Sequence, residues 1–155
     1  MPPETVFVTL HIHTDGPIPG PHSLLTLSSA AHRDDGDLIG TFTANVRELA
    51  GATLHPVSLE HWRTRAEDWL TTRRSSRPPA LATDAYLRWI DKIPGKPTLV
   101  TDPVGPDHLF LYWYLHRFAG HWPFVRTSTE PDLRERVPRP LCSLSGCRTA
   151  LAQTS

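Results

Sequence analysis

Hydrophobic and polar residues alternate in three runs over the first third of the chain. The runs cover residues 6–14, 23–32 and 38–46, and each is rich in β-branched or other apolar residues. Runs of this kind are typical of β-strands. The Asp-Gly-Pro of residues 15–17 and the Asp-Asp-Gly of residues 34–36 separate them as turn signals. The pattern therefore predicts three consecutive strands that pair as an antiparallel meander.

After these runs the period changes to that of helices. Apolar side chains recur at helical spacing over residues 58–70 and 79–93, and residues 107–119 form a strongly apolar third helix. A short β-rich run at residues 97–101 predicts a further strand. The arginine-rich residues 73–79 are interpreted as a solvated linker between the first two helices. Strands in a meander followed by helices around another strand indicate an α/β or α+β domain.

Composition limits the function and the compartment. A chain of 155 residues is one domain by default. Its formal net charge is zero, which argues against tight nonspecific binding to nucleic acid, so any phosphate-binding surface must be local. Cys142 and Cys147 are too few for a disulfide framework or a four-ligand zinc site. No signal-peptide pattern and no membrane-length apolar stretch is evident, so we expect a reduced, cytoplasmic protein that does not bind membranes.

The first predicted strand carries two histidines at alternate positions. Residues 11–25 read His-Ile-His-Thr-Asp-Gly-Pro-Ile-Pro-Gly-Pro-His-Ser-Leu-Leu. This run resembles the opening motif of DEDD-superfamily 3′-5′ exonucleases, with His-x-His in place of Asp-x-Glu. In one bacterial subgroup of that family, a similar Thr-Asp-Gly-Pro stretch follows. The resemblance continues through residues 40–45, 51–56 and 107–115.

The resemblance covers roughly residues 5–125, most of the chain. It implies a ribonuclease H-like α/β fold, with a mixed sheet whose antiparallel three-strand meander is flanked by helices. It also divides the chain into an exonuclease-like domain, residues 1–125, and a divergent C-terminal tail, residues 126–155. The tail has few large apolar residues and no convincing period.

The resemblance suggests a metal site whose ligands have changed. In the family, the Asp-x-Glu pair and an aspartate at the start of a later helix hold two divalent metals that activate water. The matching positions here are His11, His13 and Asp107. Alternate residues of a strand face the same side, so the two histidines are expected to share one face. Because imidazole is not a carboxylate, Zn, Fe, Ni, Cu or Mn is expected there rather than Mg²⁺.

Two carboxylates are candidate catalytic residues. Asp107 stands where the second motif of the resembling family places an aspartate, and its simpler role is an N-cap. Glu130, or Asp132 close by, could supply the third-motif carboxylate, and the alternative is a solvated loop residue. The general-base motif of the family, a histidine five residues before an aspartate, is absent from the tail.

Three classes of function follow. The first is a divergent exonuclease-family protein that binds single-stranded nucleic acid or a nucleotide, with phosphodiesterase activity weakened or lost. The second is an enzyme with one transition metal bound by His11, His13 and Asp107. The third is a non-catalytic scaffold. Fold alone does not choose between them.

Overall fold

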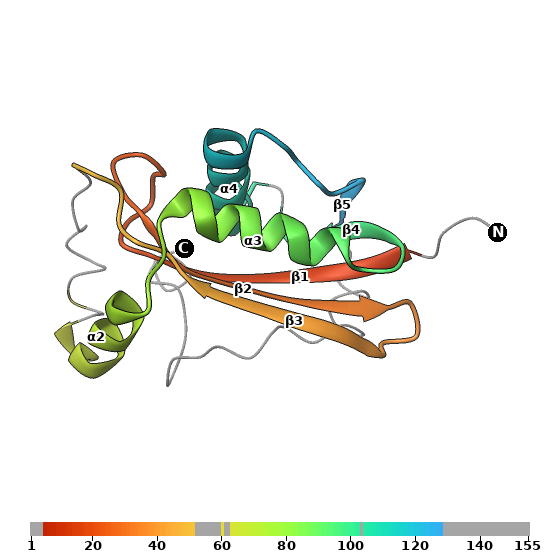
Figure 1. Cartoon of the computed structure of the whole chain (residues 1–155), viewed down its shortest axis with the longest axis horizontal. Coiled ribbons are helices and arrows are strands. Elements are labelled where there is room, and N and C mark those ends of the chain that lie inside the picture. Colours follow the sequence, from red (N-terminus) through yellow and green to blue (C-terminus); the bar gives the residue numbers. More distant parts are fainter. Residues whose placement is uncertain (1–4, 52–59, 61–62, 103, 129–155) are drawn as a thin grey trace.

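The computed structural model describes residues 5–51, 60, 63–102 and 104–128. One five-stranded sheet runs through them in the order β3-β2-β1-β4-β5 (Figure 1). The strands are β1 (Thr5–Thr14), β2 (Leu24–Arg33), β3 (Leu38–Asn45), β4 (Lys96–Val100) and β5 (Arg126–Ser128). The first three pair antiparallel, whereas β4 lies parallel to β1 and β5 parallel to β4. The predicted meander and mixed α/β sheet are confirmed.

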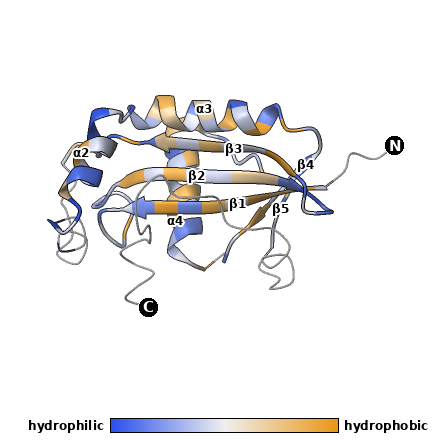
Figure 2. Ribbon diagram, turned by 90° about the horizontal axis from the view of Figure 1, so that it is seen from below, coloured by the Kyte–Doolittle hydropathy of each residue, from blue (hydrophilic) through white to orange (hydrophobic). Residues whose placement is uncertain are grey.

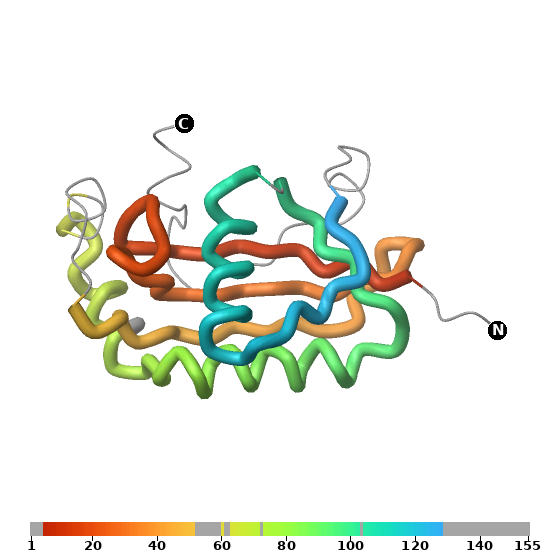
Figure 3. Tube along the Cα trace, turned by 90° about the horizontal axis from the view of Figure 1, so that it is seen from above, coloured from red at the N-terminus to blue at the C-terminus, as the bar shows by residue number. Residues whose placement is uncertain are grey.

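Helices α3 (Pro79–Asp91) and α4 (Pro106–Tyr114), with the π-helix η1 (Leu115–Ala119) that continues α4, cover one face of this sheet. Helix α2 (Ala66–Arg74) lies at an end of the sheet (Figure 1). Figure 3 shows α3 running along the side of β3 and α4 crossing the strands. The two later helices were predicted within a few residues. The predicted start of the first helix, residue 58, lies outside the described residues. Within the described part of the chain, no helix is long and apolar enough to cross a membrane.

The two sides of β1 are chemically different. Val8, Leu10 and Ile12 belong to the main hydrophobic core together with residues of α3 and α4. We call this side of the sheet the helix face. Tyr86 of α3 reaches the sheet there, and its hydroxyl lies 2.8 Å from that of Ser29 in a hydrogen bond. Because strand neighbours alternate, the odd-numbered residues of β1 point to the other side.

This other side, the histidine face, is defined by Thr9, His11 and His13 of β1 and their partners on β2. His11 lies opposite Ser28 and His13 opposite Thr26. Both of these partners are buried. Figure 2 shows hydrophilic bands on β1 toward its C-terminal end, within otherwise hydrophobic colour. A polar row on a central, buried strand departs from ordinary core composition.

The arginine-rich segment differs from its prediction as a solvated linker. Arg73 lies in the last turn of α2, and its side chain is only 13% exposed. Its guanidinium donates to the backbone carbonyls of Val46, at 2.6 Å, and Leu25, at 2.9 Å, and pairs with Glu48. The planar donor fork satisfies carbonyls at the ends of β2 and β3 simultaneously. Composition alone suggested a solvated stretch, but this residue joins α2 to the sheet.

Strand β5 was not predicted. It has only three residues, Arg126–Ser128, none of which is large and apolar. Its pairing with β4, in the register Thr98 to Arg126, makes it a strand. Hydrophobic periodicity cannot detect a short polar edge strand, and the sheet therefore extends past the residue-125 boundary drawn from the sequence.

Candidate functional site

The two histidines lie side by side, as the strand period predicted. The ring centroids of His11 and His13 are 5.2 Å apart, and the rings are nearly perpendicular, at 88°. His13 is 1% exposed and His11 8% exposed. Two buried imidazoles on one strand face can act as metal ligands or as hydrogen-bonded polar groups. Their role as ligands stays a prediction.

The loop after β1 holds the strand end that carries His13. Asp15 N–H donates to the Ser23 carbonyl at 3.0 Å, and Ser23 N–H donates back to the Asp15 carboxylate. Gly16 packs against His22 so closely that a Cβ there would overlap the imidazole ring. Glycine is thus required at this position by close approach. The two hydrogen bonds between Asp15 and Ser23 hold the ends of the loop together and fix where β1 ends.

Asp15 is a buried carboxylate that the sequence presented only as part of a turn. Asp15 follows His13 by two residues and is buried. Burial raises the pKa of its carboxyl group, and the hydrogen bond from Ser23 N–H partly offsets this rise. Tyr114 adds a second buried polar group here, because its hydroxyl accepts from Leu24 N–H at 2.7 Å. Nothing in the sequence pointed to this role, because Tyr114 lies in an apolar helix and its aromatic ring alone accounts for it there.

Asp107 lies in the first turn of α4, but it does not cap the helix. The N-cap residue is Gly105, and Pro106 occupies the first helical position. The N-cap interpretation was therefore wrong by two residues, because an Asp107 cap implies a first helical residue 108 and the helix instead begins at Pro106. A carboxylate in a first helical turn is still stabilised by the helix dipole.

The predicted three-ligand set of His11, His13 and Asp107 stays a prediction. Throughout the described ranges, no group of three His, Cys, Asp or Glu side chains is placed to hold a metal ion. Phe110 and Tyr114 pack α4 into the core of the helix face, whereas His11 and His13 lie on the other side of β1. Asp107 precedes these core residues, in the first turn of α4.

Other candidates fall elsewhere. Glu130 and Asp132, as well as Cys142 and Cys147, lie outside the described residues. His32 is buried on β2, and its Nδ1 has no hydrogen-bond partner among the residues that the structure describes. Burial lowers the pKa of His32, so the neutral imidazole is favoured.

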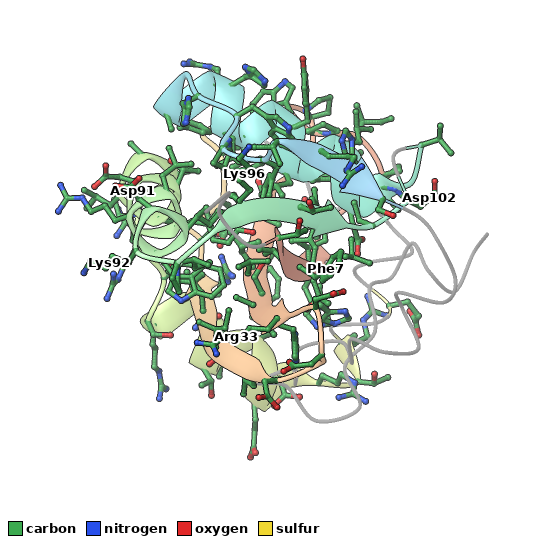
Figure 4. All side chains as sticks on the ribbon, turned by 90° about the vertical axis from the view of Figure 1, so that its right-hand side faces the viewer. Phe7, Arg33, Asp91, Lys92, Lys96 and Asp102 are labelled. Atoms are coloured by element: carbon green, nitrogen blue, oxygen red, sulfur yellow. The ribbon has the colours of Figure 1, made fainter. Side chains whose placement is uncertain are left out.

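A cavity opens at the far end of the histidine face, where β1 begins. It has a volume of about 510 Å³. Figure 4 looks onto this end of the molecule and labels Phe7 and Arg33. The described residues that line the cavity are Thr5, Phe7, Arg33, Asp34, Asp35 and Arg126. Phe7 precedes His11 by four positions and His13 by six, roughly 13 Å and 20 Å along an extended strand, so this cavity is separate from the histidine pair.

Solved structures provide the decisive comparison. A structure of Escherichia coli exonuclease I in complex with a dT13 oligonucleotide matches with a TM-score of 0.64 and 12% identity, over 85% of this chain and 30% of that one. The chain has the fold of the part of exonuclease I that it matches. The ribonuclease H-like α/β architecture expected from the sequence is therefore correct.

Further exonuclease I structures agree. A product-bound structure matches with a TM-score of 0.62 and 11% identity, over 84% of this chain and 31% of that one. A metal-free complex of the E. coli enzyme with single-stranded DNA gives 0.61 and 11%, over 79% and 28%. This chain therefore spans about a third of the length of these exonuclease I chains or less. Comparison of its sequence with protein-family models and curated proteins finds no match.

Proposed function

We propose that this protein binds single-stranded nucleic acid on an exonuclease I fold and has little or no Mg²⁺-dependent phosphodiesterase activity. The observation that carries the proposal is the buried pair His11 and His13, which occupies one face of β1 with ring centroids 5.2 Å apart. The resemblance in the sequence assigns the two metal-binding carboxylates to these positions. In this proposal the protein still binds nucleic acid but has lost the Mg²⁺-dependent cleavage.

The chemistry of the pair supports the loss of activity. A two-metal phosphodiesterase needs anionic oxygen ligands, because Mg²⁺ demands octahedral oxygen coordination and is reluctant to lose water. Neutral imidazoles supply nitrogen and no negative charge. Positive imidazoles would repel a cation outright. Both protonation states of His11 and His13 therefore bind Mg²⁺ poorly.

The test separates binding from cleavage. A fluorescein-labelled single-stranded 12-mer is titrated with the protein in EDTA and followed by anisotropy, and the same strand is incubated in Mg²⁺ and run on a gel. We expect binding without appreciable shortening. Mg²⁺-dependent shortening that survives in His11→Ala would overturn the loss of activity, and no anisotropy change for any strand would overturn the binding.

A gain-of-ligand variant sharpens this test. The double change His11→Asp with His13→Glu places two carboxylates on the histidine face and should increase Mg²⁺ affinity, measured by isothermal titration. His121→Asp is the matched control, because it exchanges an exposed histidine outside the pair for the same carboxylate. Equal Mg²⁺ affinity in the double variant and the control would contradict the placement of the site. Full nuclease activity is not expected, since the general-base motif is absent from the sequence.

A second function is favoured by the same pair. Two imidazoles in contact on one strand are suited to Zn²⁺, Fe²⁺, Ni²⁺ or Cu²⁺, and Mn²⁺ is the weakest of the transition ions we consider. The remaining positions around the ion would be open to water or substrate. In this second proposal Asp107 supplies the third protein ligand, as the resemblance in the sequence assigns it. A protein without metal binding or nucleic-acid binding would be left with the scaffold role alone.

Zinc titration tests the second function. Each ligating imidazole must be neutral, so Zn²⁺ affinity should fall as the pH drops below about 6.5. Isothermal titration at pH 7.5 and 5.5 is compared for wild type, His11→Ala and the exposed-site control His121→Ala. Loss of Zn²⁺ binding only in His11→Ala supports the pair as ligands. Equal affinity in all three proteins would rule it out.

A further inference from the structure

Four aromatic rings form a continuous strip along the outer side of α4 and η1. The strip consists of His108, Tyr112, His116 and Trp122. His108 and Tyr112 are stacked with centroids 5.9 Å apart, and Tyr112 and His116 are 4.2 Å apart. Trp122 lies beside all three, with centroid distances of 5.4 Å to His108, 5.3 Å to Tyr112 and 6.3 Å to His116. We call these four residues the aromatic strip.

Tyr112 and His116 of the aromatic strip lie outside the core of the protein, whereas Trp122 packs against it. The buried residues of α4 are Phe110, Leu111 and Tyr114, which point into the helix face. Tyr112 on the other side of the helix is 48% exposed, and His116 is exposed as well. Helical positions four residues apart share one side, which explains why residues 108, 112 and 116 align. A row of half-exposed rings on a surface helix is more than the core requires.

The position of the aromatic strip connects it with the candidate site. It begins at the residue after Asp107 and continues for eight residues of helix, about 12 Å at the usual rise. The α-helix changes to a π-helix within the strip, at Leu115. Single π turns within helices occur frequently at functional sites. The strip therefore leads away from the turn that carries Asp107.

We propose that the aromatic strip is a stacking surface for the unpaired bases of a single nucleic-acid strand. This inference rests on the proposed function and names the surface that carries it. The net charge of the chain is zero, so phosphate contacts alone provide little affinity. Base stacking on aromatic side chains needs no basic excess and tolerates every sequence. The imidazole, phenol and indole edges are polar, which suits a surface that is wet when no strand is bound.

The experiment uses the full chain and keeps the phosphates constant while the bases are removed. A labelled dT 12-mer and an abasic 12-mer with the same number of phosphates are titrated in EDTA and followed by anisotropy. We expect the abasic strand to bind at least about fivefold more weakly, since stacking of each base contributes measurably. The dependence of affinity on salt should be shallow, because few phosphates are neutralised.

Protein variants place the effect on the aromatic strip. Tyr112→Ala and His116→Ala should each weaken dT 12-mer binding by about five- to a hundredfold, whereas Tyr112→Phe keeps the ring and should bind like wild type. Leu109→Ala is the matched control, because this side chain on the same helix is nearly as exposed as Tyr112 and has no ring. Melting curves confirm that all four variants are folded.

The outcomes are distinct. If wild type binds the dT 12-mer and Tyr112→Ala binds it equally well, the stacking surface is refuted while the proposed function stands. Equal binding of the abasic strand leads to the same conclusion. If wild type binds no strand at all, the proposed function fails and this inference fails with it.

Discussion

The two sides of β1 are both buried but are built from opposite chemistry. On the helix face, Val8, Leu10 and Ile12 meet the aromatic residues of α3 and α4 in one hydrophobic core. On the histidine face, the same strand presents Thr9, His11 and His13, all of them buried. Apolar burial stabilises the fold in proportion to area, whereas a buried hydrogen-bonded polar group contributes only about 0.5–1.5 kcal/mol net. The helix side of β1 is therefore expected to contribute more to stability than the histidine side.

Hydrogen bonding on the histidine face supports this division. Thr9 donates to the Ala30 carbonyl at 3.3 Å, and the Ser28 and Thr43 hydroxyls are 3.4 Å apart. These bonds are long, so they compensate weakly for lost water. The Thr98 hydroxyl and Nδ1 of His32 find no partner among the described residues. A face of this kind is expected to respond to mutation quite differently from the helix face.

The largest effect is expected on the helix face. Phe110→Ala removes a fully buried ring from the core and should lower the free energy of unfolding by about 3–5 kcal/mol. Tyr112→Ala, two residues along the same helix but half-exposed, should change it by no more than about 0.5 kcal/mol. Urea unfolding followed by circular dichroism measures both. Similar losses in the two variants would show that the aromatic strip is part of the core.

The next effect concerns the arginine that joins α2 to the sheet. Arg73→Met keeps much of the side-chain bulk but removes the charged donor to the Val46 and Leu25 carbonyls, of which Leu25 keeps only the bond from Val46 N–H, so about 1.5–3 kcal/mol should be lost. Arg73→Lys should recover only part of it, because an ammonium cannot reproduce the planar fork. The exposed neighbour Arg74→Met is the control. If Arg73→Met lowers the free energy of unfolding no more than Arg74→Met does, Arg73 behaves as the solvated linker residue that the sequence predicted.

The reasons for these outcomes show what the sequence could predict. The strand meander, the second and third helices and the pairing of His11 with His13 on one face all depend on local period, and local period is written in the sequence. The role of Arg73 depends on carbonyls 27 and 48 residues away in the chain. Contacts between distant segments carry no local signal, so composition gave a solvated linker instead.

The candidate site was predictable only in part for the same reason. The spacing of His11 and His13 fixed their common face, but the position of Asp107 relative to them depends on which face of the sheet α4 covers. The Asp15 carboxylate and the Tyr114 hydroxyl became notable only when the fold buried them beside Ser23 and Leu24. The turn already explained Asp15 and the apolar helix already explained Tyr114, so the sequence did not point to their buried hydrogen bonds.

A change of opposite sign is expected on the histidine face. Thr98→Val exchanges a buried hydroxyl without a described partner for a methyl group of nearly the same shape. Removing this desolvated group should raise the free energy of unfolding by up to about 1 kcal/mol. The parallel change Thr83→Val is the control, since the Thr83 hydroxyl donates to the Pro79 carbonyl at 2.8 Å. Destabilisation by Thr98→Val would show that its hydroxyl is satisfied after all.

The smallest effect is a pH dependence from the same face. Burial lowers the pKa of His32 below its ordinary value of 6.5, so the unfolded chain takes up a proton before the folded protein does. The corresponding stability is complete above pH 6.5 and is lost as the pH falls from there through the lower folded-state pKa. Urea midpoints at pH 7.5 and 5.5 should therefore differ less in His32→Phe than in wild type. An unchanged difference would show that His32 titrates normally.

The edge of the sheet has a consequence for handling the protein. Strand β3 is outermost, and its eight residues, Leu38–Asn45, include no charge and no proline. Within the described residues, α3 runs beside this strand, and the bridge between Val46 and Arg77 is its only further backbone pairing, so most of the outer N–H and C=O groups have no strand partner. Long uncharged edges act as templates for strands of other molecules, which natural proteins usually prevent with lysine or proline. Concentrated solutions should thus aggregate through β3, and a lysine at the exposed position of Thr43 would improve solubility.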